Sequence, residues 1–444
     1  MTATKTLVQQ IMTTPLITDE RVLTIATQAL TDYFACILTS KNELEIQQLK
    51  QWISDEGGNA TSWLIGQKQA ATARQAALFN GFQAHFLDYD DVHAEVRGHP
   101  SAVILSALFA SINMAKTSEN LTALNSQRFL TAYVIGVEIM ARLGVALNPT
   151  HYNQGFHPTG TLGGIGAVAA ICYLHQYDFL EQALALTATQ TAGLRLMFGT
   201  PIKPLHAGLA AQSAIQTIEI LKHGLTAQAD FLDEKMGFMA VYGNAQSILD
   251  IQNWGQSWKI VEPGLWFKTY NFCSAAATVA DAASILQPQI NPDEIDKIKL
   301  QFNPKGDAAL IYTQPETQVK GRFSAEYIVA KILCNEPLDA HAFTTNPIPL
   351  HIQKIMQKID RTYGESSQRF GAVKVRLKNG EILQHCVEHP KGSPKKPYSE
   401  RELYEKLANA IQNDDLSQRF FASLQTFKLE SNLYHFINQY KDIL

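Results

Sequence analysis

The segment GFHPTGTLGGIGAVAA, residues 155–170, joins a histidine and a proline to a long run of small residues. Proline suits the first turn of a helix, and glycine allows a neighbouring backbone to approach closely. These glycines are not accompanied by the lysine and the preceding strand of a phosphate-binding loop. We therefore predict a helix that begins near Pro158 and packs tightly against other helices.

The same arrangement occurs twice more, in HPSAVILSALFA at residues 99–110 and in KPLHAGLAAQSAI at residues 203–215. Each segment places an imidazole or an ammonium group beside the opening turn of a helix, where unpaired N–H groups carry partial positive charge. Such helix ends attract anions. If the three ends converge, they would surround a small di- or tricarboxylate, with bases nearby to move its protons.

The spacing of apolar residues divides the chain into two parts. From Leu7 to about Ile260 the spacing is helical, whereas IDKIKLQF (295–302) and GAVKVRLKNGEIL (371–383) alternate apolar and polar residues as strands do. The prediction is a mainly α protein, with a large all-helical domain of residues 1–265 and 400–444 and a smaller α+β domain of residues 266–399. The Pro- and Lys-rich stretch HPKGSPKKPYS (389–399) is the loop that returns the chain to the helical domain.

The composition narrows the classes of partner and location. Among 444 residues, 37 Lys and Arg balance 41 Asp and Glu, and no long basic run occurs, so nucleic acid and anionic membranes are not favoured partners. The five cysteines show no CxxC spacing, which is typical of a reduced protein without a zinc site. We expect a cytoplasmic protein with a small-molecule substrate, since neither a signal peptide nor a membrane-spanning run is evident.

The densest polar cluster is LDYDDVHAEVRGH at residues 87–99. Asp88 and Asp91 lie three positions apart, a spacing that shares one face if the helix continues. Solvated acids at a helix end are the alternative, but a helix C-terminus ordinarily favours cations. Buried acids beside imidazoles shift one another's pKa values, which supplies an acid and a base near neutral pH.

A metal site is a further alternative for this cluster. Asp90, Asp91 and Glu95 are faintly similar to the Mg²⁺-binding aspartates of helical isoprenoid synthases. The second acidic motif is not evident, because Asn413-Asp414-Asp415 falls in a predicted surface loop. We therefore expect no metal ion.

Two further clusters contain groups suited to acid–base chemistry. Tyr152 and His157 lie in HYNQGFHPTG, and Lys203 stands in the otherwise apolar stretch FGTPIKPLHAG. An ammonium held near a partly buried site can neutralise a substrate carboxylate or stabilise an enolate-like intermediate. The alternative for Lys203 is a solvated loop lysine.

Taken in order, the motifs NGFQAHFLDYDD, GHPS, GFHPTGTLGGIGA, FGTPIKPLHAGLAAQ and PKGSP resemble those of the MmgE/PrpD family. The family includes 2-methylcitrate dehydratase, cis-aconitate decarboxylase and iminodisuccinate epimerase. The resemblance implies a helical domain completed by the C-terminal helices, a smaller α+β domain, a homodimer, and an active site between the domains without metal or organic cofactor.

Carried over residue by residue, the resemblance implies Asp88, His99, His157 and Lys203 as site residues, and we predict a catalytic set and a substrate-binding set around these four. The catalytic set is Asp88, His99, His157, Lys203 and Tyr152. The substrate-binding set is Arg97, His93, Thr159, Lys268, Cys273 and Ser274.

This chain departs from the family pattern at two positions. Val92 stands where many members have a threonine, and Ala277 stands where members often have a histidine. A dehydratase-like reaction is our first prediction, although the missing histidine puts dehydration and decarboxylation in doubt. Arg97-Gly98-His99 together with Tyr152 is similar to iminodisuccinate epimerase, so epimerisation is the second. Decarboxylation is the third, and a non-catalytic carboxylate-binding protein is the alternative from another class.

Overall fold

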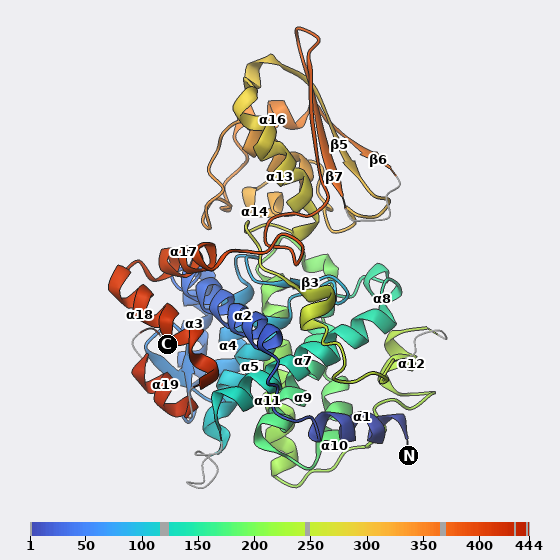
Figure 1. Cartoon of the computed structure of the whole chain (residues 1–444), viewed down its shortest axis with the longest axis vertical. Coiled ribbons are helices and arrows are strands. Elements are labelled where there is room, and N and C mark those ends of the chain that lie inside the picture. The colour runs from blue at the N-terminus through green and yellow to red at the C-terminus, as the bar shows by residue number, and fades with distance from the viewer. Residues whose placement is uncertain are drawn as a thin grey trace.

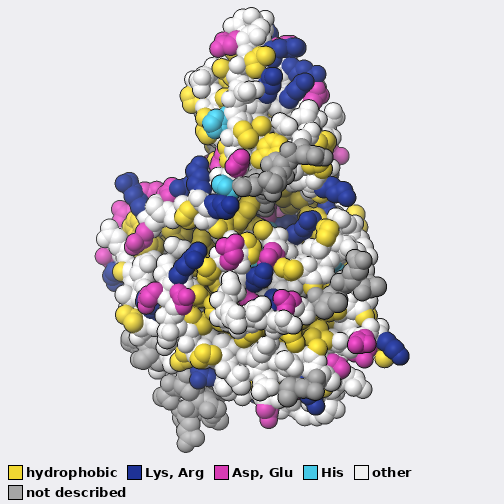
Figure 2. Space-filling model, turned by 45° about the vertical axis from the view of Figure 1, so that its right-hand side comes forward, with side chains coloured by type: hydrophobic (Ala, Val, Ile, Leu, Met, Phe, Trp, Pro, Cys, Tyr) yellow, Lys and Arg dark blue, Asp and Glu magenta, His cyan; other side chains and the backbone are white. Residues whose placement is uncertain are grey.

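The computed structural model describes residues 2–115, 124–244, 249–364, 370–429, 432–440 and 443. Figure 1 shows a broad helical lobe that carries both chain termini and a narrower lobe, built on a sheet, above it. Charges of both signs are interspersed over the face shown in Figure 2. A mainly α fold with a smaller α+β domain, as predicted from the sequence, is confirmed.

The large domain is a cluster of helices from both ends of the chain. In order along the chain they are α1 (Ala3–Met12), α2 (Glu20–Thr39), α3 (Leu44–Glu56), α4 (Ala73–His85), α5 (Pro100–Ser111), α7 (Ser126–Leu147), α8 (Thr150–Asn153), α9 (Pro158–His175), α10 (Leu180–Ala188), α11 (Ile202–Lys222), α12 (Phe238–Tyr242), α17 (Glu400–Ile411), α18 (Asp414–Gln425) and α19 (Leu433–Gln439). Figure 1 shows the C-terminal helices beside α2 and α3.

The C-terminal helices share one apolar core with the helices that precede the sheet. Phe420 of α18 is buried and lies 5.2 Å, between ring centroids, from Phe34 of α2. Burial of a side chain of this size stabilises the fold by about 1.5–3 kcal/mol. Asn413 caps α18, so Asp414 and Asp415 lie in the first turn of a helix, and their prediction as a loop is wrong.

Two short antiparallel strand pairs also belong to this helical lobe. β1 (Ser62–Leu64) pairs with β2 (Gln69–Ala71), and β3 (Val92–His93) pairs with β4 (Leu265–Trp266). The sequence analysis expected helices alone here, because strands of two or three residues are too short to show alternation. The second pair matters for the site, since it attaches the 87–99 segment to the chain that enters the small domain.

The small domain is a four-stranded sheet covered by helices on one face. The strand order is β6 (Ile359–Tyr363), β5 (Ile295–Phe302), β7 (Gly371–Leu377) and β8 (Ile382–Val387), with only the β5–β6 pair parallel. Its helices are α13 (Ala277–Leu286), α14 (Gln318–Gly321), α15 (Ala325–Leu333) and α16 (Leu350–Met356). Along β7, burial alternates with the strand period, so one face of the sheet packs on a second apolar core and the other meets solvent.

Two helices, α2 and α7, are long and apolar enough to cross a membrane by composition alone. In this structure 78% and 89% of their apolar windows are buried inside the protein. Both helices are therefore core helices of the large domain.

The predicted helix starts are close to those observed. α5 begins at Pro100 and α9 at Pro158, so His99 and His157 are the residues just before each helix. α11 begins at Ile202, which places Lys203 inside its first turn rather than ahead of it.

A close crossing of α4 and α11 brings two of these segments together. A Cβ added to Gly208 would lie 2.2 Å from the Leu78 carbonyl oxygen, and one added to Gly81 would lie 2.8 Å from the Gly208 Cα. Only glycine permits backbones to approach this closely. The crossing therefore sets the end of α4 against the start of α11, where Lys203 lies.

Gly208→Ala should separate α4 and α11 and lower the free energy of unfolding by about 1–3 kcal/mol, because an added methyl group in a packed contact forces the backbones to shift. Urea denaturation measures the change. Gln216→Ala, at a half-buried position further along the same helix, is the control. A Gly208→Ala variant as stable as the parent would show that the crossing is looser than described.

Candidate active site

A cavity of about 550 Å³ lies between the two domains. Its walls include eight of the residues predicted from the sequence: Asp88, Arg97, His99, Tyr152, His157, Lys203, Cys273 and Ser274. The small domain adds residues that the sequence analysis did not single out: Thr278, Asn303, Lys305 and Phe323. The three helix starts thus meet at one cavity, as their composition indicated.

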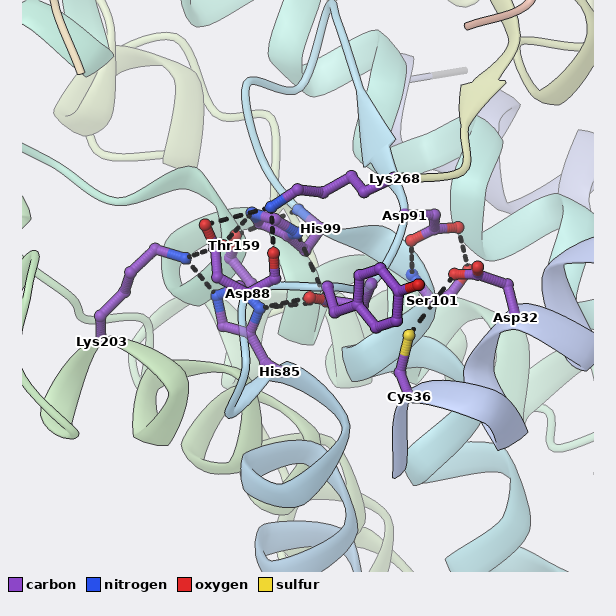
Figure 3. A network of polar contacts seen from close by, with 12 residues as sticks. Asp32, Cys36, His85, Asp88, Asp91, His99, Ser101, Thr159, Lys203 and Lys268 are labelled. Carbon is purple, nitrogen blue, oxygen red and sulfur yellow. Dashed lines mark hydrogen bonds and ion pairs between the residues drawn. The ribbon is translucent and has the colours of Figure 1, made fainter. Parts of the chain in front are cut away.

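Asp88 lies at the centre of the polar network (Figure 3). Its carboxylate is 2.7 Å from the Lys203 ammonium and 3.1 Å from that of Lys268, which also donates to the Asp88 carbonyl. Burial opposes ionisation of Asp88, but the two ammonium groups outweigh it and keep its pKa well below the usual range. Asp88 is therefore a fixed anion that positions cations, and it is poorly suited to accept a proton.

His85 and Asp90 complete this network; the sequence analysis did not single out His85, and it considered Asp90 only as part of an alternative metal site. His85 Nε2 lies 2.7 Å from Lys203 Nζ, and its Nδ1 lies 2.8 Å from Asp90. Since the ammonium can only donate, Nε2 accepts and Nδ1–H donates to Asp90. Burial lowers the pKa of His85 to about 3 even though Asp90 opposes the shift, so the ring is neutral.

His99 bridges the two carboxylates. Its Nε2 is 3.4 Å from Asp88 and its Nδ1 is 3.3 Å from Asp90. The His99 ring also packs on that of His85, with centroids 4.1 Å apart. This imidazole is held in one orientation at the cavity wall.

His157 presents a neutral imidazole to the cavity. Its Nδ1 lies 3.0 Å from Nδ1 of His206, and its ring is nearly perpendicular to that of Phe198, with the centroids 5.1 Å apart. Burial, with Lys203 adding to it, lowers the pKa of His157 well below its ordinary value. The ring is therefore neutral at pH 7, and Nε2 is the nitrogen left for a substrate.

Tyr152 has the properties of a proton donor. Burial raises its pKa to about 12, so the phenol keeps its proton at neutral pH. The guanidinium of Arg195 lies 3.9 Å from the centre of its ring, and that of Arg97 lies 5.3 Å away. Arg195, which the sequence analysis missed, also donates to the Ala308 carbonyl of the small domain at 2.7 Å, so it joins the two walls of the cavity.

Three predicted binding residues lie behind the cavity wall. His93 is buried in β3 and contacts the Lys259 carbonyl at 2.9 Å, while Thr159 accepts a hydrogen bond from the His99 backbone N–H. Lys268 is buried against Asp88. None of the three is among the residues that line the cavity. They therefore support the residues that form its wall.

A group of four residues has the donor set of a metal site. Ligand atoms of His85, Asp88, Asp90 and His99 all lie within 4.8 Å of one another. The ammonium groups of Lys203 and Lys268 contact atoms of the same cluster. Because these cations already neutralise the carboxylate charge, the donor set is poorly suited to a further cation.

The two departures from the family pattern lie in different places. Val92 lines the main cavity with an apolar side chain. Ala277 faces a separate cavity of about 20 Å³ beside Lys268 and Ser274. In the same part of the small domain, burial raises the pKa of the Cys273 thiol, so it is a poor nucleophile.

Stability should fall as pH is lowered from about 6.5 to 4. Burial lowers the pKa of His85 to about 3 and those of His93, His175 and His206 to about 4. In the unfolded chain these rings take up protons below about 6.5, so over this range the unfolded state binds more protons and is favoured. Each ring contributes up to about 1.4 kcal/mol per pH unit.

Urea midpoints measured from pH 8 to 5 test this dependence. His175→Gln, far from the cavity, should make the slope shallower, and His223→Gln at an exposed position should leave it unchanged. Equal stability at pH 7 and pH 5 would contradict the neutral, buried state of these rings.

Comparisons with known proteins agree with the geometry. The chain is similar to cis-aconitate decarboxylase of Homo sapiens, with 25% identity over 76% of this chain and 72% of that protein. A cis-aconitate decarboxylase-like protein of Aspergillus oryzae is 23% identical over 93% of this chain and 91% of its own length. Cis-aconitate decarboxylase of Aspergillus terreus is 23% identical over 79% of this chain and 78% of that protein.

Two family models match the two parts of the chain. The MmgE/PrpD N-terminal domain matches residues 7–249, and the MmgE/PrpD C-terminal domain matches residues 270–418. The cavity described above lies between the parts of the chain that these models cover. The chain therefore belongs to the MmgE/PrpD family.

Proposed function

We propose that the chain is a cofactor-free lyase or isomerase that removes a proton alpha to a carboxylate in a small di- or tricarboxylate. A 2-methylcitrate dehydratase-like hydro-lyase is the leading form of the proposal. The family and its decarboxylase relatives support an enzyme of carboxylate metabolism. The homodimer and the cytoplasmic location stay predictions of the sequence.

One observation carries the proposal: a neutral imidazole, a protonated phenol and several cations line the same cavity. His157 and Tyr152 are the acid–base pair, and Lys203, Arg97 and Lys305 are the cations. A site with this set can bind a polyanion and move its protons without an added group.

The cations serve two steps. Arg97 and Lys203 hold carboxylates on the side of the large domain, while Lys305 reaches the cavity from the small domain. When His157 removes the alpha proton, negative charge spreads onto the neighbouring carboxylate as an enolate. Lys203 stabilises this charge from a site largely shielded from water, where such stabilisation is strongest.

The fate of the enolate separates the alternatives. In dehydration the beta hydroxyl leaves with a proton, which Tyr152 or His99 donates. In epimerisation His157 removes the proton from one face of the carbon, and Tyr152 donates a proton to the opposite face. Arg97 and Tyr152, which line the cavity together, are the observation that favours this second candidate.

Decarboxylation is the third candidate, supported by the names of the relatives. The position where family members often have a histidine is Ala277, and the space beside it is about 20 Å³. A volume of this size holds about one water molecule rather than an imidazole. The chain is thus packed around an alanine there, which weighs equally against any dehydration or decarboxylation that needs that base and leaves the carboxylate-binding protein as an alternative.

Incubation with 2-methylcitrate, citrate, cis-aconitate and iminodisuccinate in D₂O, followed by NMR, tests the proposal. A new alkene marks dehydration, deuterium at an inverted carbon marks epimerisation, and loss of a carboxylate marks decarboxylation. Lys203→Ala and His157→Ala should each slow the observed reaction by about 10²–10⁴-fold, since each removes a group that acts on the transferred proton or its charge.

Lys222→Ala, at the far end of α11, is the matched control and should react as the parent does. Exchange that survives both site variants would contradict the roles given to Lys203 and His157. Binding of these acids without exchange or turnover would overturn the proposal that the chain is an enzyme and would favour a carboxylate-binding protein.

A further inference from the structure

A buried lysine lies behind the cavity and takes no part in the proposed chemistry. Lys406 of α17 has a side chain that is only 2% exposed, and its ammonium is 2.6 Å from the Asp32 carboxylate in α2. A charge is expensive to bury unless it is paired, and Asp32 supplies the partner. Figure 3 shows Asp32 at the opposite end of the polar network from Lys203.

The same ammonium also binds the backbone of two segments that form the site. It donates to the Tyr89 carbonyl at 2.9 Å and to the Lys268 carbonyl at 3.1 Å. It lies 3.6 Å from the centre of the Tyr89 ring, within the range of a cation–π contact. One side chain from the C-terminal helices thus joins the segment after α4 to the segment that enters the small domain.

Both anchored residues adjoin the centre of the site. Tyr89 follows Asp88, and Lys268 places its own ammonium on the Asp88 carboxylate. Asp88 has a φ of +53°, a left-handed conformation that is unfavourable for residues other than glycine and persists where the surroundings hold it. Lys406 binds the carbonyl of Tyr89, the residue that immediately follows Asp88.

We propose that Lys406 is a positioning residue of the active site, which aligns Asp88 and Lys268 by binding the carbonyl oxygens of Tyr89 and Lys268. Helix α17, which follows the small domain, is then part of the site as well as of the core. The kinetic consequence rests on the proposed function, whereas the geometric consequence does not.

A double substitution separates positioning from simple stability. Asp32→Asn with Lys406→Met removes both charges together, so no unpaired charge is left in the interior. Glu138→Gln with Arg142→Met does the same to a second buried pair, whose atoms are 2.6 Å apart and contact none of the cavity residues. The two double variants are compared by melting temperature, by reaction rate in D₂O, by calorimetric binding of tricarballylate, and by crystal structure.

We expect Asp32→Asn/Lys406→Met to fold and to bind tricarballylate within about threefold of the parent, because the cations that line the cavity remain. Its rate should fall by about 10²-fold, because displacing catalytic groups by about 1 Å slows a reaction by about that factor. In its crystal structure Lys268 Nζ should have left the Asp88 carboxylate. Glu138→Gln/Arg142→Met should lose thermal stability but keep its rate within twofold.

A folded Asp32→Asn/Lys406→Met variant with the parental rate would overturn the proposal, as would an equal loss of rate in both double variants. If the parent protein itself transforms no acid, the proposed function fails, and the crystal structure then decides the positioning role. A Lys268–Asp88 contact unchanged from the 3.1 Å described here would overturn it.

Discussion

The contacts of Asp88 with Lys203 and Lys268 are the interaction on which the rest of the site depends. They join the end of α4, the first turn of α11 and the segment that leads into the small domain. A buried carboxylate with two ammonium partners is stable only if all three are held in place, because loss of one partner leaves a charge uncompensated. The glycine crossing of α4 and α11 provides that placement on one side.

The chemistry of the cavity follows from which charges the interior tolerates. Burial keeps His85 and His157 neutral, while the carboxylates of Asp88 and Asp90 are paired with cations or imidazoles. The cations of Arg97, Lys203 and Lys305 line the cavity wall, where they can bind a substrate. An anionic substrate therefore enters a site that already holds a neutral base, so binding and proton abstraction are served by different residues.

Much of this site could be predicted from the sequence because local rules place it. Proline at the first helical turn fixes where α5 and α9 begin, and His99 and His157 immediately precede those turns. The sequence analysis expected Lys203 just ahead of α11, whereas Lys203 lies in the first turn of that helix. The family motifs then added Asp88 to the same predicted site.

What could not be predicted depends on contacts between residues far apart in sequence. His85 meets Lys203, and Arg195 meets Ala308, only after the helices and the two domains have packed. The sequence analysis did not single out Lys406, which is buried against Asp32 although its helix, α17, is amphipathic. Similarly, His93 and Thr159 have side chains suited to binding a substrate. In the structure they contact backbone groups behind the cavity wall instead.

A crystal structure with tricarballylate bound tests the central claim most directly, because this unreactive tricarboxylate resembles the proposed substrates. The account predicts carboxylates on Arg97 and Lys203, with a methylene carbon about 3–3.5 Å from His157 Nε2. A ligand bound elsewhere, or one in the cavity with His157 turned away from it, would contradict the account.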